Sequence, residues 1–251
     1  MHVLNVENVA LHFGGLAVLQ GLSFSVQAGE KVALIGPNGA GKTTLINVLS
    51  GLVRPQSGRV FFLGNDVTAL APEARVRLGL GRSFQVIRLF QQLSLLTNVL
   101  LAIQGVQGTR YDMIRLMGSH AGNIARARTL LELVDLWAQR DVPISALAYG
   151  QQRKAEILLA LASKPKLLVM DEPGAGLTRA ESENLIQMID DLAGDTAVLL
   201  SDHDMDLVFK VAQRVMVLHY GQLISEGTPE EIQADPKVRE LYLGAKKARH
   251  A

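Results

Sequence analysis

A glycine-rich stretch, Gly36–Thr44, constrains this chain more than any other part of its sequence. It has the pattern G-x-x-x-x-G-K-[ST] and lies between an apolar run typical of a buried strand, Val32–Ile35, and a segment with helical character, Leu45–Leu49. Glycines let the backbone curl tightly, so that successive N–H groups at the start of a helix point toward phosphate oxygens. Lys42 would reach the outer phosphates, and the hydroxyl of Thr43 would bind a magnesium ion. The motif predicts a site for a nucleoside triphosphate, whereas a turn needed only for tight packing would not require the lysine and threonine.

Composition limits what such a chain can do. Its 251 residues suffice for one large domain or two small ones. Lysine and arginine number 25 against 24 acidic residues, which argues against bulk attraction to nucleic acid. The chain has no cysteine, so disulfides and thiolate metal sites are excluded. Met1–Asn8 lacks the features of a signal peptide, and no apolar run approaches the roughly 18 residues that cross a bilayer. We therefore expect contact with a membrane only through a partner.

Apolar residues that alternate with polar ones flank the glycine-rich stretch. They predict strands in Leu4–Val9, Leu22–Val26 and Arg59–Leu63, the last bounded by turn residues, and these strands indicate a small antiparallel sheet. Phe13 lies between a histidine and a glycine pair. Its side chain is interpreted either as part of the sheet core or as an exposed ligand contact, and the local pattern leaves both open.

The middle of the chain has a different character. From Val86 to Ala162 no convincing strand occurs, and we interpret this region as a helical insertion. Gln104–Gly122 contains four glycines and little periodicity, which predicts a loosely built connection between helices. The apolar residues at helical spacing are Ile124, Ala127, Leu130, Leu131, Val134 and Trp137.

Two carboxylates follow an apolar run, Leu167–Met170, that fits a fully buried strand after Pro165 has ended a helix. In open α/β sheets ligands lie at the carboxyl ends of strands, where the glycine-rich loop also lies. Asp171 is thus placed to hold magnesium through water, and Glu172 to orient or deprotonate an attacking water. The alternative is a carboxylate pair that merely opens a surface turn.

A further strand, Thr196–Leu200, precedes Ser201-Asp202-His203-Asp204. Because this strand ends near the same edge of the sheet, we expect His203 to reach the outer phosphate or a water molecule. Asp204 is expected to cap the next helix.

Together these motifs resemble, over nearly the whole chain, those of the ATP-binding subunits of ABC transporters. Gly36–Thr44 matches the Walker A loop, Leu167–Glu172 the Walker B strand, and Leu147–Arg153 the signature motif. Gln85 matches the Q-loop glutamine and His203 the switch histidine. The resemblance implies an α/β fold: a P-loop NTPase (RecA-like) core with an antiparallel β subdomain and an inserted α-helical subdomain. In one domain, 1–251, the core would take 1–85 and 164–251, and the helical signature subdomain 86–163.

The resemblance also implies cofactors and roles. ATP and Mg²⁺ would be bound, with Phe13 stacking on adenine. The metal would contact Thr43, Asp171 and Gln85, and catalysis would involve Glu172, His203 and Gln85. The remaining nucleotide contacts would come from the Walker A loop and from the signature motif of a facing subunit: Gly36, Pro37, Asn38, Gly39, Ala40, Gly41, Lys42, Thr43, Thr44, Ala148, Tyr149, Gly150 and Gln151.

Two positions depart from the family pattern. The signature motif normally has serine where this chain has Ala148, so a hydrogen bond to the γ-phosphate is missing, worth about 1.5–3 kcal/mol if charged. Helix-start amides nearby can still face that phosphate. The D-loop usually ends in aspartate, but Gly174–Leu177 is followed by Thr178. Thr178 and Glu181 form a capping box for a helix predicted over Arg179–Ala193.

The amino-acid sequences around Gln85 and in the D-loop resemble those of importers of branched-chain and hydrophobic amino acids. Near the end of the chain, Thr228–Glu231 predicts the capped start of another helix. The resemblance implies a head-to-tail dimer with a second ATPase chain, identical or different, on the cytoplasmic face of the membrane. Integral permease subunits would bind near Gln85, Ile87, Leu89 and Phe90, and a solute-binding protein would act indirectly. The alternatives are a soluble ABC-type ATPase, a relative that imports urea or short amides, and a module that closes on ATP without useful hydrolysis.

Overall fold

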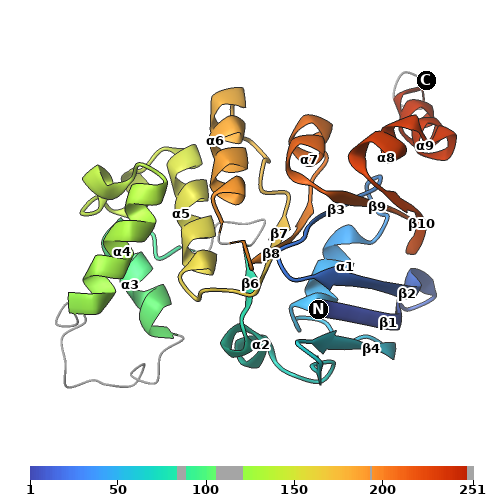
Figure 1. The fold of residues 1–251 in the computed structure, drawn as a ribbon, viewed down its shortest axis with the longest axis horizontal. Coiled ribbons are helices and arrows are strands. Elements are labelled where there is room, and N and C mark those ends of the chain that lie inside the picture. Colours follow the sequence, from blue (N-terminus) through green and yellow to red (C-terminus); the bar gives the residue numbers. More distant parts are fainter. Residues whose placement is uncertain (84–88, 106–120, 193, 248–251) are drawn as a thin grey trace.

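The computed structural model of the chain describes residues 1–83, 89–105, 121–192 and 194–247. Two β-sheets and a group of helices make up this part of the chain (Figure 1). Within the described residues, no helix is long and apolar enough to cross a membrane.

The core sheet has six strands in the order β10-β9-β3-β8-β7-β6. All neighbours pair in parallel except β10, which is antiparallel to β9. Its inner strands are continuous apolar runs because helices or the second sheet cover both faces. The strands are β3 (Lys31–Ile35), β6 (Leu80–Arg82), β7 (Leu167–Asp171), β8 (Ala197–Ser201), β9 (Arg214–His219) and β10 (Gln222–Gly227).

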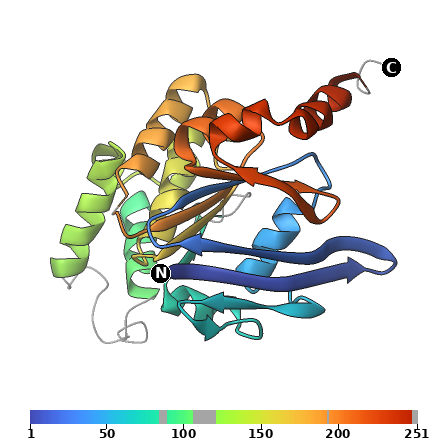
Figure 2. The same ribbon diagram turned by 45° about the vertical axis from the view of Figure 1, so that its right-hand side comes forward.

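The predicted antiparallel sheet is present, in the order β2-β1-β4-β5. Leu4 pairs with Val26 and Val6 with Phe24, so the alternating apolar residues lie on one buried face. Figure 2 shows the long β1–β2 hairpin with β4 beside it. The strands are β1 (His2–Phe13), β2 (Leu16–Gln27), β4 (Ser57–Phe62) and β5 (Asn65–Asp66).

Helix α1 (Lys42–Leu49) lies between the two sheets, because its buried residues share one apolar cluster with β1 and with one face of β3. The other face of β3 belongs to a second cluster formed with helices of the middle and later chain. The remaining helices are α2 (Pro72–Leu78), α3 (Leu95–Gly105), α4 (Ala121–Leu133), α5 (Tyr149–Leu161), α6 (Arg179–Asp190), α7 (Met205–Val211), α8 (Pro229–Ala234) and α9 (Pro236–Lys247), with short 3₁₀ turns at Trp137–Gln139 and Ile144–Ala146.

The described part of the middle region is helical, as predicted, apart from an isolated bridge between Ser94 and Pro143. The apolar residues predicted at helical spacing pack in or against the second cluster. The connection predicted over Gln104–Gly122 lies almost entirely outside the described residues. Pro165 follows the end of α5 at Leu161 as expected.

One helix boundary was predicted too far along the chain. Helix α6 begins at Arg179 behind the expected Thr178–Glu181 capping box, but it ends at Asp190 and not at 193. Two aspartates stand at this end, where the helix dipole disfavours negative charge. The carboxylate of Asp190 accepts a 2.5 Å hydrogen bond from Lys31 Nζ at the start of β3. The capping box at Thr228 and Glu231 is confirmed.

A buried arginine in α2 holds the carboxyl end of α1. The side chain of Arg75 is 1% exposed, and Nη1 donates to the carbonyls of Val48 and Leu49 at 2.8 and 2.6 Å. The other nitrogens donate to Leu70 O and Thr68 O, each at 3.1 Å. Burial lowers the pKa of Arg75 to about 10, so the group stays charged at neutral pH. The cation therefore sits where the α1 dipole is negative.

We expect Arg75→Met to lower the free energy of unfolding by about 3 kcal/mol, because helix-end carbonyls would stay buried without donors. Urea denaturation of the purified chain measures the change. Arg77→Met, on an exposed position of the same helix, is the control. Equal losses in both variants would contradict the capping role of Arg75.

Candidate nucleotide site

The loop between β3 and α1 is fixed by close main-chain contacts. Gly36 has φ +154°, and a Cβ there would lie 2.1 Å from the carbonyl oxygen of Leu218 in β9. Gly41 has φ +108°, and its Cβ would lie 2.8 Å from Val18 O in β2. Gly221 N donates to Ala40 O at 2.9 Å. Only glycine fits the first two positions, and two distant segments of the chain, β2 and the end of β9 with the turn after it, hold the loop in place.

Lys42, the first residue of α1, is buried beneath this loop. Its Nζ donates to Gly36 O at 2.6 Å and to Pro37 O at 3.1 Å. Burial lowers the pKa of Lys42, while the charges of Glu172, Asp171 and Asp202 act in the opposite direction. The ammonium group is thus held by its own loop, and carboxylates lie near enough to favour its charged form.

Asp171 ends β7 beside the loop and is 1% exposed. Its Oδ1 accepts a 2.6 Å hydrogen bond from the hydroxyl of Ser201, and the hydroxyl of Thr43 lies 3.5 Å from the same oxygen. Its Oδ2 is buried and has no hydrogen-bond partner among the described residues. An unsatisfied carboxylate oxygen beside a threonine hydroxyl suits Mg²⁺, which prefers oxygen ligands and keeps several waters. The residues present therefore fit a magnesium ion.

Glu172 follows in an unusual backbone conformation, with φ +49°. For a residue other than glycine this conformation costs about 1–3 kcal/mol and persists only where neighbours hold it. Its N–H donates to Ser201 O at 2.7 Å, and its carbonyl accepts a 2.7 Å hydrogen bond from Arg153. The backbone of Glu172 is thus fixed from two sides.

A cleft of about 440 Å³ joins several of the predicted residues. It is lined by Phe13, Leu16, Val18, the loop residues Asn38–Thr44, and Glu172. The side chain of Phe13 is 55% exposed, so the interpretation that places it in the sheet core is wrong. The phosphate-loop amides, one carboxylate and one open aromatic face therefore meet in a single cleft.

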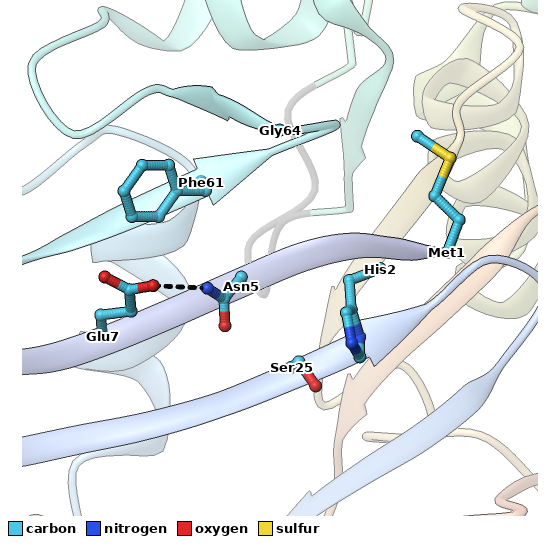
Figure 3. A pocket seen from close by; sticks show the side chains of 7 residues that line it. All are labelled: Met1, His2, Asn5, Glu7, Ser25, Phe61 and Gly64. Atoms are coloured by element: carbon cyan, nitrogen blue, oxygen red, sulfur yellow. Dashed lines mark hydrogen bonds between the residues drawn. The ribbon is translucent and has the colours of Figure 1, made fainter.

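A second hollow, of about 500 Å³, lies on the outer face of the antiparallel sheet (Figure 3). In it, Asn5 Nδ2 donates to Glu7 Oε1 at 2.8 Å, and His2, Ser25 and Phe61 are nearby. None of the predicted site residues lines this hollow. The cleft at the phosphate loop is therefore the candidate site.

His203 follows β8 on a turn organised by Asp202. The Asp202 carboxylate is buried; its Oδ1 accepts from the N–H groups of His203 and Asp204 at 2.7 and 3.0 Å. Its Oδ2 accepts from Gly174 N at 2.9 Å. His203 Nδ1 lies 3.6 Å from Asp202 Oδ1, and 66% of the histidine side chain is exposed. Asp204 caps α7 as predicted.

The signature motif opens α5, with Ala148 at the N-cap position. Alanine offers no cap acceptor, but Gln151 Oε1 accepts from Ala148 N at 3.1 Å. The hydroxyl of Tyr149 lies 3.4 Å from Ala175 O, and a Cβ on Gly150 would meet the carboxylate of Glu181. None of the residues 148–151 lines the cleft. Gln85 lies outside the described residues, so its place is not given.

Sequence reasoning missed three residues that shape this site. Ser201 is the last residue of β8 and Asp202 follows it directly, and Arg153 lies within the signature motif. The sequence offered one signal for Ser201 and Asp202, namely that they begin a run of polar residues at the end of a predicted strand. That strand lies next to the one that ends at Asp171. Nothing in the sequence indicated that Arg153 would reach the end of β7.

Comparison with known proteins gives consistent results. Residues 19–175 match the family model "ABC transporter", and residues 222–248 match "Branched-chain amino acid ATP-binding cassette transporter". The chain is 36% identical to the high-affinity branched-chain amino acid transport ATP-binding protein LivG of Salmonella typhimurium, over 96% of this chain and 98% of LivG. It is 35% identical to the lipopolysaccharide export system ATP-binding protein LptB of Acidithiobacillus ferridurans, over 96% and 97% of the two chains.

Among solved structures, the crystal structure of an ATP-binding cassette of an ABC transporter in its ADP conformation superimposes with a TM-score of 0.86. That protein is 32% identical in sequence, and the match covers 97% of this chain and 99% of the other. The agreement extends over both sheets and the helical group.

Proposed function

Because this chain belongs to the ABC transporter family, as an ATP-binding subunit with ATPase activity, we propose that it hydrolyses ATP to energise import of branched-chain or other hydrophobic amino acids. The observation that carries the ATPase part is the cleft lined by the phosphate loop and Glu172, together with the unsatisfied Oδ2 of Asp171, whose other carboxylate oxygen lies 3.5 Å from the hydroxyl of Thr43 in that lining. The solute class is supported by the match at residues 222–248 and by the similarity to LivG.

In this proposal the amides of Gly36–Thr44 bind the phosphates of ATP, and Lys42 contacts the outer ones. Phe13 stacks on adenine from its exposed position at the cleft edge. Thr43, Asp171 and Gln85 hold Mg²⁺, whose positive charge offsets the charge that develops on the phosphates. The roles of Thr43 and Asp171 are supported by their shared contact and by the free Oδ2.

Glu172 is the proposed general base, which orients the attacking water and takes its proton. His203 contacts the γ-phosphate, with Asp202 fixing the turn that presents it. Gln85 contacts the metal and the water. All three roles come from the family pattern, and the fixed backbone of Glu172 supports the first of them.

Two subunits face head to tail in this proposal, identical or different, so that Ala148–Gln151 of each covers the nucleotide of the other. The absence of these residues from the lining of their own cleft supports this arrangement. Residues 1–85 and 164–251 form the ATP-binding core, and 86–163 the helical subdomain.

Integral permease subunits hold the ATPase at the cytoplasmic face of the membrane and exchange solute with a solute-binding protein. Within the stretch predicted to contact a permease, Leu89 is buried, whereas Phe90 is 60% exposed and offers an apolar contact. Closure of the ATPase dimer on ATP is converted into alternating access, and hydrolysis reopens it.

The substrate class is tested by reconstituting the chain with its membrane partners in vesicles that contain ATP, with the solute-binding protein added outside. We expect leucine, isoleucine or valine to stimulate ATP hydrolysis and to enter the vesicles. Stimulation of ATP hydrolysis by urea or short amides alone, or movement of a lipid in the opposite direction, would contradict the proposed solute class. The ATPase assignment would still hold. Failure to copurify with any membrane protein would favour a soluble ATPase.

We expect Ala148→Ser to raise the ATPase rate of the complex, because the serine hydroxyl restores a hydrogen bond to the γ-phosphate across the dimer. The same change adds an N-cap acceptor to α5 and should raise Tm by about 2–4 °C, which corresponds to about 1 kcal/mol. Ala148→Gly improves the cap without a hydroxyl and is the matched control. An unchanged rate in Ala148→Ser would reject the idea that alanine at this position slows hydrolysis of the ATP that the signature motif of this chain covers.

A further inference from the structure

The guanidinium of Arg153, one turn into α5, reaches the end of β7. Arg153 is 1% exposed. Its Nη2 donates to the carbonyl oxygens of Glu172 at 2.7 Å and Asp171 at 3.3 Å, and its Nε donates to Pro173 O at 3.2 Å. A single side chain therefore binds the main chain of three consecutive residues, one of which is the proposed general base.

A buried counterion accompanies it. Arg153 Nη1 donates to Glu156 Oε2 at 2.6 Å, and Glu156 is 5% exposed. A buried ion pair is a weak source of stability, because desolvation offsets most of the attraction. Its geometry here points to another use: the planar fork of an arginine can bind several acceptors at once, which the single ammonium group of a lysine cannot reproduce.

Arg153 binds the carbonyl of Glu172, the residue with the strained backbone conformation. Glu172 has φ +49°, and its N–H is already bonded to Ser201 O in β8. The guanidinium supplies the second anchor, on the carbonyl side. With both anchors in place, the direction in which the Glu172 side chain leaves the backbone is defined.

The first turn of α5 is bound to the residues that follow Glu172. A Cβ on Gly176 would lie 3.0 Å from the ring of Tyr149, and a Cβ on Gly150 would lie 1.8 Å from Glu181 Oε1. Tyr149 and Gly150 thus pack against the segment 174–181, while Arg153 binds 171–173. The first turn of α5 is proposed to contact the partner's ATP. A continuous set of contacts therefore joins this turn to the backbone of Glu172.

We propose that Arg153 is a positioning residue, which holds the main chain of Glu172 in its catalytic geometry and transmits displacement of the first turn of α5 to it. This inference rests on the proposed function. Nucleotide that is bound by the partner against α5 would then act on this chain's own Glu172, and the two ATP sites of a dimer would be coupled through Arg153.

The test compares Arg153→Lys with wild type in the purified full chain and its transporter complex. We expect kcat to fall about 10- to 100-fold, the loss typical of a displaced catalytic group, while the Kd for ATP and the fraction of folded protein stay unchanged. Arg75→Lys is the matched control, because Arg75 is equally buried and also bonded to main-chain carbonyls, but away from Glu172. It should lower Tm and leave kcat per folded molecule intact.

If Arg153→Lys fails to fold, the double substitution Arg153→Met with Glu156→Met removes both charges and avoids leaving one of them buried alone. It should fold and show the same loss of kcat at an unchanged Kd. A normal kcat in either folded variant, or an equal loss of kcat in Arg75→Lys, would overturn the inference. Wild-type protein that binds ATP but does not hydrolyse it would instead overturn the proposed function.

Discussion

Replacing Glu172 with glutamine should lower the rate of ATP hydrolysis about 1,000-fold, because an amide cannot accept the proton of the attacking water. ATP binding should persist, since glutamine has nearly the same shape and the main-chain bonds of residue 172 to Ser201 and Arg153 do not involve the side chain. Single-turnover hydrolysis of labelled ATP by wild type and variant, at equal nucleotide occupancy, measures the effect.

The matched control is Glu183→Gln, on the exposed surface of α6, where the carboxylate pairs only with an exposed arginine among its described partners. It should hydrolyse ATP at the wild-type rate. Indistinguishable single-turnover rates for wild type and Glu172→Gln would favour a module that closes on ATP without useful hydrolysis.

Replacing Lys42 with methionine should weaken ATP binding about 100-fold. The ammonium group is buried against the loop that would hold the phosphates, and losing one charged partner of a desolvated contact costs about 2–5 kcal/mol, where 1.4 kcal/mol is a tenfold change. Calorimetric titration with ATP and Mg²⁺ measures the Kd.

A folding defect gives a different result from a lost phosphate contact. Methionine leaves Gly36 O and Pro37 O without their donor, so the Tm is expected to fall, and the Kd is measured at a temperature at which the variant is fully folded. Lys166→Met, which removes an exposed lysine paired with Asp195, is the control for charge alone and should bind ATP normally. Unchanged ATP affinity in Lys42→Met would contradict the role of this loop.

The sequence predicted those elements whose pattern is local. The strands around Leu22–Val26 and Leu167–Met170, and the caps at Thr178 and Thr228, depend on neighbouring residues, and all are present. The carboxyl end of α6 was misplaced because helix ends depend on where a side chain such as Asp190 finds its partner.

Parts of the site that depend on distant contacts could not be predicted in this way. Alternation alone left Phe13 ambiguous, because the end of a strand has no regular burial pattern; the structure exposes it. Arg153 lies in a helix 18 residues before Asp171, and its bonds to the end of β7 arise only when α5 packs on the core sheet. The role of Asp202 likewise depends on a distant contact, because its carboxylate accepts a hydrogen bond from the N–H of Gly174, 28 residues away.

The clamping of the phosphate loop has a thermodynamic consequence. The carbonyl oxygens of Leu218 and Val18 lie against Gly36 and Gly41, and Gly221 N donates to Ala40 O, so the loop is held by its own chain. A preorganised loop loses little conformational entropy when a ligand arrives, so most of the favourable contact energy remains as affinity. We therefore expect any shape change on nucleotide binding to occur outside the loop, as movement of whole layers of the fold relative to it.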